Sequence, residues 1–194
     1  GQEQTVLVYD FGGGTFDVSV LEQDEGLLEV TTSRGDTALG GSDIDAALLE
    51  WVMEQLGKDR ETVARDLAGM TRLADAVERA KIALSTREEV RLFEAFLAGE
   101  SSRAVNLDLR VTRADLERLA APFVDRTLRC IDSALHDAGT SPEGLDRVVL
   151  VGGTSRMPLV QRRVREHLGR PVICDDQADR AVALGAARLA ARMA

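Results

Sequence analysis

The sequence has no long apolar run, no excess of positive charge and only two cysteines, and each of these features excludes a class of function. No apolar stretch approaches the length of a membrane span, and residues 1–4 do not have the composition of a signal peptide. The formal net charge is −9, whereas duplex nucleic acid is bound by basic patches. Cys130 and Cys174 lie far apart without the spacing of metal ligands, which predicts reduced, unpaired thiols. We therefore expect a cytoplasmic globular protein that binds neither nucleic acid nor a membrane.

Apolar residues make up 44% of the 194 positions, which is enough for one domain or for two small lobes. A buried strand is predicted to begin within a few residues of Gly1, so we expect the chain to be a piece of something longer. The distribution of predicted strands and helices along the chain indicates an α/β fold. Residues 1–43 and 139–194 contain the core strands and are expected to form a sheet-based subdomain. Residues 44–138 are mostly helical with one β-hairpin, and are expected to form an inserted helical subdomain.

Hydrophobic periodicity and capping residues predict the individual elements. Ser42 or Asp43 is expected to cap the first helix, Thr112 and Asp115 form a capping box for the third, and Pro122 is expected to kink that third helix. Helices are predicted over residues 44–56, 67–84, 113–138, 159–168 and 180–193, and strands over residues 5–9, 16–20, 27–33, 89–96, 104–111, 147–151 and 171–174.

A glycine turn between the first two strands is the strongest functional signal. Its backbone N–H groups can approach a ligand closely because glycine has no Cβ, and a row of such amides suits phosphate oxygens. Thr15 adds a hydroxyl, and Asp10 and Asp17 add carboxylates that could hold Mg²⁺ through its waters. No Lys-Ser or Lys-Thr pair follows, so this is not a Walker loop, and an ordinary tight hairpin is the alternative. The glycines are Gly12, Gly13 and Gly14.

Three further groups are candidates for nucleotide contacts, and each has a plain structural alternative. Glycines after the strand at 147–151 open a helix, where anions bind, although a simple β–α turn has the same pattern, and the following arginine could stack on adenine. Three polar residues share one face of the helix at 67–84, although such a face is usually solvated. An aspartate before the last helix could bond a ligand or act only as a cap. The candidates in the glycine turn are Gly152, Gly153, Thr154 and Arg156. Those on the helix face are Glu78, Lys81 and Ser85, and the aspartate before the last helix is Asp179.

Five motifs, taken in order, resemble those of one family. They occupy residues 10–17 (DFGGGTFD), 35–41 (GDTALGG), 78–81 (ERAK), 151–158 (VGGTSRMP) and 181–187 (AVALGAA). Together they are similar to the second lobe of the ATPase domain of the seventy-kilodalton heat-shock chaperones of the DnaK type. The resemblance covers essentially the whole chain.

The resemblance implies an actin-like ATPase fold, which is ribonuclease H-like, with this chain as one lobe and its inserted helical subdomain. ATP or ADP is the implied ligand, with its β and γ phosphates on the three glycines and Thr15. Asp10 and Asp17 would help to place Mg²⁺ and K⁺ or the attacking water, so Asp10, Thr15 and Asp17 are the implied catalytic residues. The implied lining of the adenosine pocket is Glu78, Lys81, Ser85, Gly152, Gly153, Thr154, Arg156 and Asp179.

The resemblance also implies partners. In the intact family, ATP hydrolysis drives cycles of unfolded-peptide binding and release in the stress response. A J-domain co-chaperone stimulates hydrolysis, and a nucleotide-exchange factor grips the helical subdomain to release ADP. The peptide-binding domain and the first lobe, which carries the other phosphate hairpin, are absent from this sequence.

The sequence departs from the family pattern at Ser42 (usually Glu), Ile82 (often Arg), Gln177-Ala178 (usually Asn-Pro) and Arg180 (usually Glu). Phosphoryl transfer depends on positioning and charge stabilisation from all sides, so this chain alone is expected to bind nucleotide weakly and not to hydrolyse it. One alternative is an interaction module for a nucleotide-exchange partner with negligible nucleotide binding. Another is a different actin-like protein, such as a sugar kinase or a filament protein, and the order of the motifs argues against it.

Overall fold

The computed structural model describes residues 4–24, 27–99 and 104–174, together with helical positions 183, 185, 187, 190 and 191. The chain divides into two compact units. Gly1–Ser42 and Pro122–Ala194 form the first, here called the sheet unit, and Asp43–Ala121 form the second, the helical unit. The second boundary is predicted at the end of a long helix, after residue 138, whereas in the structure the division falls inside that helix.

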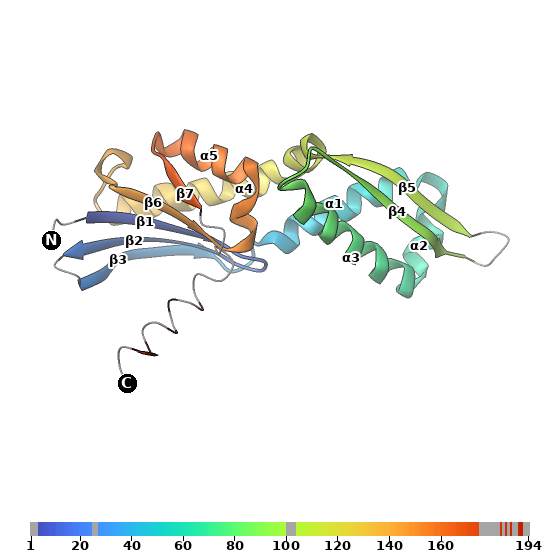
Figure 1. The fold of residues 1–194 in the computed structure, drawn as a ribbon, viewed down its shortest axis with the longest axis horizontal. Coiled ribbons are helices and arrows are strands. Elements are labelled where there is room, and N and C mark those ends of the chain that lie inside the picture. The colour runs from blue at the N-terminus through green and yellow to red at the C-terminus, as the bar shows by residue number, and fades with distance from the viewer. Residues whose placement is uncertain are drawn as a thin grey trace. The chain divides into compact units, whose positions relative to one another are not determined.

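The sheet unit is built on a five-stranded mixed sheet with the strand order β3-β2-β1-β6-β7 (Figure 1). Neighbouring strands β1, β2 and β3 are antiparallel, while β1 with β6 and β6 with β7 are parallel. Segments far apart in the sequence, β1 and β6, therefore lie side by side at the centre of the sheet. The strands are β1 (Gln4–Phe11), β2 (Phe16–Asp24), β3 (Leu27–Asp36), β6 (Arg147–Val151) and β7 (Val172–Cys174).

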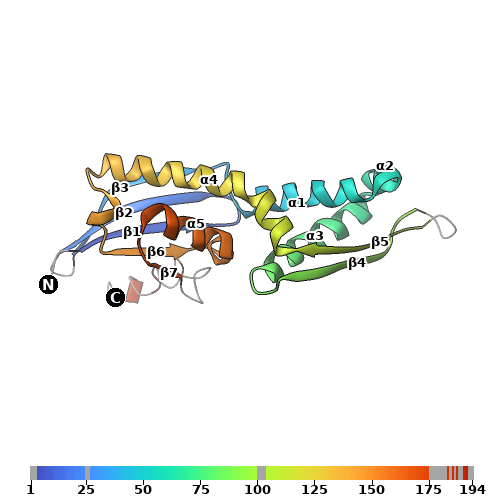
Figure 2. The same ribbon diagram turned by 90° about the horizontal axis from the view of Figure 1, so that it is seen from above.

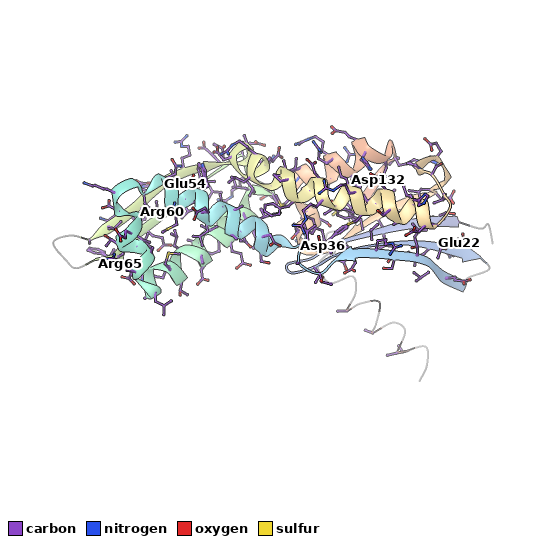
Figure 3. All side chains as sticks on the ribbon, turned by 180° about the vertical axis from the view of Figure 1, so that it is seen from behind. Glu22, Asp36, Glu54, Arg60, Arg65 and Asp132 are labelled. Carbon is purple, nitrogen blue, oxygen red and sulfur yellow. The ribbon has the colours of Figure 1, made fainter. Side chains whose placement is uncertain are left out.

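Two helices pack on the same face of this sheet: the part of α4 (Arg113–Asp137) that follows Ala121, and α5 (Pro158–Leu168) (Figure 2). The hydroxyl of Tyr9 on β1 shares a buried hydrogen bond of 2.8 Å with the hydroxyl of Thr127 on α4. An ion pair between Arg163 and Asp125 joins the two helices, and the His167 ring nitrogen lies 2.6 Å from the carboxylate of Asp132, which is labelled in Figure 3. Alternate strand residues fill the core below the helices: Leu7, Tyr9, Phe11, Phe16, Val18, Val20, Val148 and Leu150.

The helical unit contains the antiparallel hairpin of β4 and β5 and the helices that flank it. Both strands of the hairpin and the α-helices of the unit contribute buried apolar residues to one core. The helical unit therefore does not depend on the sheet to bury its apolar residues. The elements are α1 (Gly41–Gln55), which begins in the sheet unit, η1 (Gly57–Asp59), α2 (Arg60–Arg65), α3 (Leu67–Leu84), β4 (Glu89–Ala98), β5 (Val105–Thr112) and the first residues of α4.

Helix α3 approaches β4 very closely at its first turn. A Cβ built on Gly69 would overlap the carbonyl oxygen of Leu97, so only glycine allows this packing. Arg72, one turn later, donates to the carbonyls of Phe96 at 2.9 Å and Leu97 at 3.0 Å. Asp66 caps the helix by accepting from the Gly69 amide at 2.8 Å. The start of α3 is therefore fixed by backbone contacts that sequence periodicity does not reveal.

Several predicted elements are confirmed and others are corrected. The helix predicted over residues 67–84 has both ends where the sequence places them. The capping box before α4 is confirmed, because the Asp115 amide donates to the Thr112 hydroxyl at 3.1 Å and the Thr112 amide donates to the Asp115 carboxylate at 3.2 Å. The proposed caps Ser42 and Asp43 are wrong, since α1 begins at Gly41 and both residues lie within its first turn.

Other differences concern segments without a clear period. Strand β3 continues to Asp36, whereas it is predicted to end at residue 33 and to be followed by a loop. The short helices η1 and α2 are missing from the predicted elements. Asp179 and most of the predicted last helix lie outside the described residues. In the described part of the chain, no helix is both long enough and apolar enough to cross a membrane.

Candidate nucleotide site

Buried aromatic side chains at the ends of β1 and β2 anchor the turn between these strands. Phe11 and Phe16 end the two strands, pair directly in the register and are fully buried, with ring centroids 5.7 Å apart in an edge-to-face arrangement. Above them the Gly12 amide donates to the Thr15 carbonyl at 3.0 Å, which closes the turn. The core residues therefore fix both ends of the glycine segment, while Gly13 and Gly14 are exposed.

The carbonyl groups of the turn are already bonded to other elements. The Gly12 carbonyl accepts from the Gly41 amide at 3.0 Å and from the Thr154 hydroxyl at 2.8 Å. The Gly13 carbonyl accepts from the amide and the hydroxyl of Ser42, at 2.8 and 2.9 Å. These bonds attach the turn to the start of α1 and to the segment after β6.

This pattern determines where the amides of the turn point. In a planar trans peptide the N–H lies opposite to the preceding C=O. The Gly13 and Gly14 amides are therefore directed away from α1 and from the segment after β6. Neither has a hydrogen-bond partner in the described part of the chain, and both residues are exposed. Two exposed amides beside each other form a site suited to an anion such as a phosphate.

Two carboxylates flank the same turn. Asp10 and Asp17 are directly opposite each other on β1 and β2, with Asp10 half-buried and Asp17 exposed. Burial raises the pKa of the Asp10 carboxyl, and the negative charge of Asp17 raises it further. Across the described residues, no group of three or more acidic, histidine or cysteine side chains could hold a metal ion by itself. The pair fits Mg²⁺, which is commonly bound by one or two carboxylates together with waters and substrate phosphates.

The second glycine turn lies beside the first, because β6 is parallel to β1 and Val151 is the partner of Asp10 in the register. Gly152 has φ of 84°, and a Cβ placed there would overlap the Phe11 carbonyl and lie 2.6 Å from Oδ1 of Asp10. Gly152 therefore permits a close backbone approach to the Asp10 carboxylate. In contrast, a Cβ on Gly153 would meet no atom within 4 Å, so the space beside it is open.

The segment after Gly152 differs from its prediction. The glycines do not open α5 but a short 3-10 helix, η3 (Gly153–Arg156), and α5 begins only at Pro158. Two side-chain hydrogen bonds hold this turn: the Ser155 hydroxyl donates locally to the Val151 carbonyl at 2.6 Å, and the Thr154 hydroxyl reaches a partner far away in the sequence. Thr154 is buried and its hydroxyl bonds the Gly12 carbonyl, so it joins the two turns, while Arg156 is exposed.

The remaining candidates belong to the helical unit, so only their local surroundings are described. Glu78 is exposed on α3, Ser85 is the half-buried C-cap of that helix, and Lys81 between them is buried. The Lys81 ammonium lies 2.5 Å from the carboxylate of Asp45 on α1. Asp45 is absent from the sequence-based candidates, because no local spacing links residues on different helices. Asp179 lies outside the described residues.

A mixed sheet in which neighbouring parallel strands each end in a glycine turn, with a second unit inserted between those strands in the sequence, is the architecture of an actin-like ATPase lobe. The chain belongs to the Hsp70 family, whose family model, described as "Hsp70 protein", matches residues 1–193. It is thereby part of an Hsp70 nucleotide-binding domain, and ATP binding is expected for the family.

Curated relatives agree with this assignment. The chain is 43% identical to "Chaperone protein DnaK" of Thermotoga petrophila over 196 residues, which cover 100% of this chain and 33% of the relative. It is 43% identical to the protein of that name from Cenarchaeum symbiosum over 188 residues, 96% of this chain and 28% of the relative. It is 39% identical to the protein of that name from Thermosipho africanus over 195 residues, which cover 100% of this chain and 33% of the relative. The chain thus spans about a third of the length of these relatives.

Proposed function

We propose that this chain is the nucleotide-holding lobe of a DnaK-type chaperone and that the turn after β1 binds the β and γ phosphates of ATP or ADP. One observation carries the proposal. The carbonyls of Gly12 and Gly13 are bonded to α1 and to the segment after β6, so the exposed amides of Gly13 and Gly14 point to the opposite side. A hairpin whose glycines only made the turn would not need its carbonyls held by three other residues.

In this proposal the two carboxylates place the cations and the water. Asp10 and Asp17 would hold Mg²⁺ through its hydration shell, help to place K⁺ and orient the attacking water, while Thr15 would contact the phosphates. The open space beside Gly153 and the exposed guanidinium of Arg156 support a place for the adenosine. The further residues proposed to line the adenosine pocket are Glu78, Lys81, Ser85, Gly152, Thr154 and Asp179.

The proposed reaction belongs to the whole chaperone. Transfer of a phosphoryl group to water requires charge stabilisation on all sides of the phosphate, and this chain offers one phosphate hairpin. We propose that the chain alone binds adenine nucleotide weakly and has negligible turnover. In the whole protein, ATP hydrolysis would drive peptide binding and release. A J-domain co-chaperone would stimulate the hydrolysis, and an exchange factor would bind the helical unit to release ADP.

Calorimetric titration of ADP with Mg²⁺ tests the phosphate site. Gly14→Asp is the informative variant, because a Cβ at Gly14 meets no atom within 4 Å and the new carboxylate would repel a phosphate. We expect wild type to bind and Gly14→Asp to lose at least about tenfold in affinity, which corresponds to the loss of a single charged hydrogen bond. Ser133→Asp adds the same charge on an exposed position of α4 and should bind like wild type.

The same titration separates the proposal from an interaction module. A folded wild-type chain that releases no heat with ADP would contradict the phosphate site and favour the module. The departures at Ser42 and Ile82 are the main sequence arguments for the module, yet the amide and hydroxyl of the substituted residue Ser42 both donate to the Gly13 carbonyl. The substitution therefore reinforces the turn.

A further inference from the structure

Lys81 is a buried lysine, with only 9% of its surface exposed. Lysine is almost never this buried unless its charge is paired, because an ammonium loses its hydration when it leaves water. Its partner is Asp45, whose Oδ2 lies 2.5 Å from Nζ. The two residues come from α3 and α1 and both belong to the helical unit, so the pair joins two helices across the interior of that unit.

Asp45 is not optimised for stability at this position. Its Oδ1 is buried and has no hydrogen-bond partner among the described residues. Burial raises the pKa of the Asp45 carboxyl, and the neighbouring charge of Glu78 adds to this rise while the Lys81 ammonium opposes it. A half-buried carboxylate with one unpaired buried oxygen is a cost to the fold, and replacing a largely buried ion pair by apolar residues is often neutral or stabilising. The arrangement therefore calls for a role beyond packing.

We propose that Asp45 is a positioning residue, which holds the Lys81 ammonium in the direction required to bond the adenosine part of the nucleotide. This inference rests on the proposed function, in which Lys81 contacts adenosine. The lysine side chain is long and flexible, so an unguided ammonium loses rotamer entropy when it binds a ligand. The bond to Asp45 restricts the orientations that the Lys81 ammonium can adopt, so its N–H donors keep a defined direction. The pair thus pre-organises the contact before the nucleotide arrives.

A double-mutant cycle distinguishes positioning from a purely structural link between the helices. ADP with Mg²⁺ is titrated into wild type, Asp45→Asn, Lys81→Met and the double variant. We expect Asp45→Asn to weaken ADP binding by about five- to tenfold in the wild-type background, the scale of one charge-assisted hydrogen bond. In the Lys81→Met background the same substitution should leave the affinity unchanged, because Asp45 acts only through the lysine. An equal loss in both backgrounds, or no loss in either, would overturn the proposal.

Glu50→Gln is the matched control. Glu50 lies on α1 like Asp45 and its carboxylate forms an ion pair with Arg60 at 2.6 Å, but both partners are exposed; Arg60 is labelled in Figure 3. The substitution removes the same charge from the same helix, and the ADP affinity should equal that of wild type. A loss as large as that of Asp45→Asn would show a general charge effect and overturn the positioning role.

A second measurement follows the ammonium without nucleotide. In ¹⁵N NMR spectra of the lysine side chains, the protons of a buried and hydrogen-bonded NH₃⁺ group exchange with water slowly enough to give a resolved signal. We expect such a signal for Lys81 in wild type and in Glu50→Gln, and its loss in Asp45→Asn. Should Asp45→Asn not fold, Asp45→Glu takes its place in both experiments, since it keeps the charge and moves the carboxylate. A Lys81 signal that is unchanged by the substitution at Asp45 would contradict the inference.

The outcomes also separate this inference from the function on which it rests. If wild type binds ADP and Lys81→Met binds equally well, the phosphate site stands and the positioning role is wrong. If folded wild type does not bind ADP, the proposed function is wrong and the positioning role falls with it.

Discussion

At neutral pH the charge of Asp10 opposes the folding of the sheet unit. Its carboxyl is half-buried at the end of β1 and directly opposite Asp17, and both conditions raise its pKa above the usual value. A carboxyl whose pKa is higher in the folded state contributes stability when it is protonated, and this contribution is lost as the pH rises through the folded pKa. A residue kept at such a cost is typical of a functional site, in agreement with the cation site proposed above.

We therefore expect Asp10→Asn to stabilise the sheet unit while it weakens the Mg²⁺-dependent binding of ADP. The substitution removes both the buried charge and the repulsion from Asp17, so the gain at pH 7 should be on the order of 1 kcal/mol, or about 2–4 °C in melting temperature. The gain should vanish below about pH 4, where the wild-type carboxyl is also neutral. Thermal unfolding of both proteins at pH 7 and pH 3.5 measures this difference. A variant less stable than wild type at pH 7 would contradict the electrostatic argument.

At the scale of elements, sequence patterns predict what local periodicity and capping determine. The helix at 67–84 and the capping box of Thr112 and Asp115 are local features, and both are confirmed. The start of α1 is not local, because the amides of Gly41 and Ser42 bond the carbonyls of a turn about thirty residues earlier. The 3-10 helix η3 similarly depends on the Thr154 hydroxyl reaching the Gly12 carbonyl. Errors therefore occur where a distant segment supplies the hydrogen-bond partner.

The contact between α3 and β4 predicts that Gly69→Ala destabilises the protein, although helix propensity alone would predict that it stabilises. In an exposed helix position Gly→Ala stabilises by about 1 kcal/mol. At Gly69 the added Cβ would overlap the Leu97 carbonyl, so we expect Gly69→Ala to lower the free energy of unfolding of the helical unit by about 1–3 kcal/mol. Thr71→Ala, on an exposed position of the same helix, should change stability by less than about 0.5 kcal/mol. Urea unfolding followed by circular dichroism compares the two, and a stabilised Gly69→Ala protein would show that the contact does not form.

At the scale of the whole molecule, the candidate site is only partly predictable from the sequence. The turn at Gly12–Gly14 and its flanking carboxylates are contiguous in the chain, so their chemistry can be inferred from their order alone. That Gly152 approaches the Asp10 carboxylate follows only from the parallel pairing of β1 with β6, whose partners are about 140 residues apart. The pairing of Lys81 with Asp45 likewise depends on the packing of two helices. The sequence thus predicts the parts of the site, and the tertiary contacts add the residues that hold those parts in place.

Because each unit has a core of its own, a substitution that destabilises one core should lower the local stability of that unit alone. Leu48 on α1 is fully buried in the helical unit and Leu150 on β6 is fully buried in the sheet unit. Truncation of a buried leucine to alanine costs about 2–5 kcal/mol, through lost burial and the cavity left behind. We expect Leu48→Ala to increase amide hydrogen exchange within residues 43–121 alone, and Leu150→Ala within residues 4–42 and 122–174 alone, as measured by mass spectrometry of peptides. Increased exchange in both units of either variant would instead mean that the chain unfolds as one cooperative body, and a nucleotide held by the sheet unit would then stabilise the helical unit to the same extent.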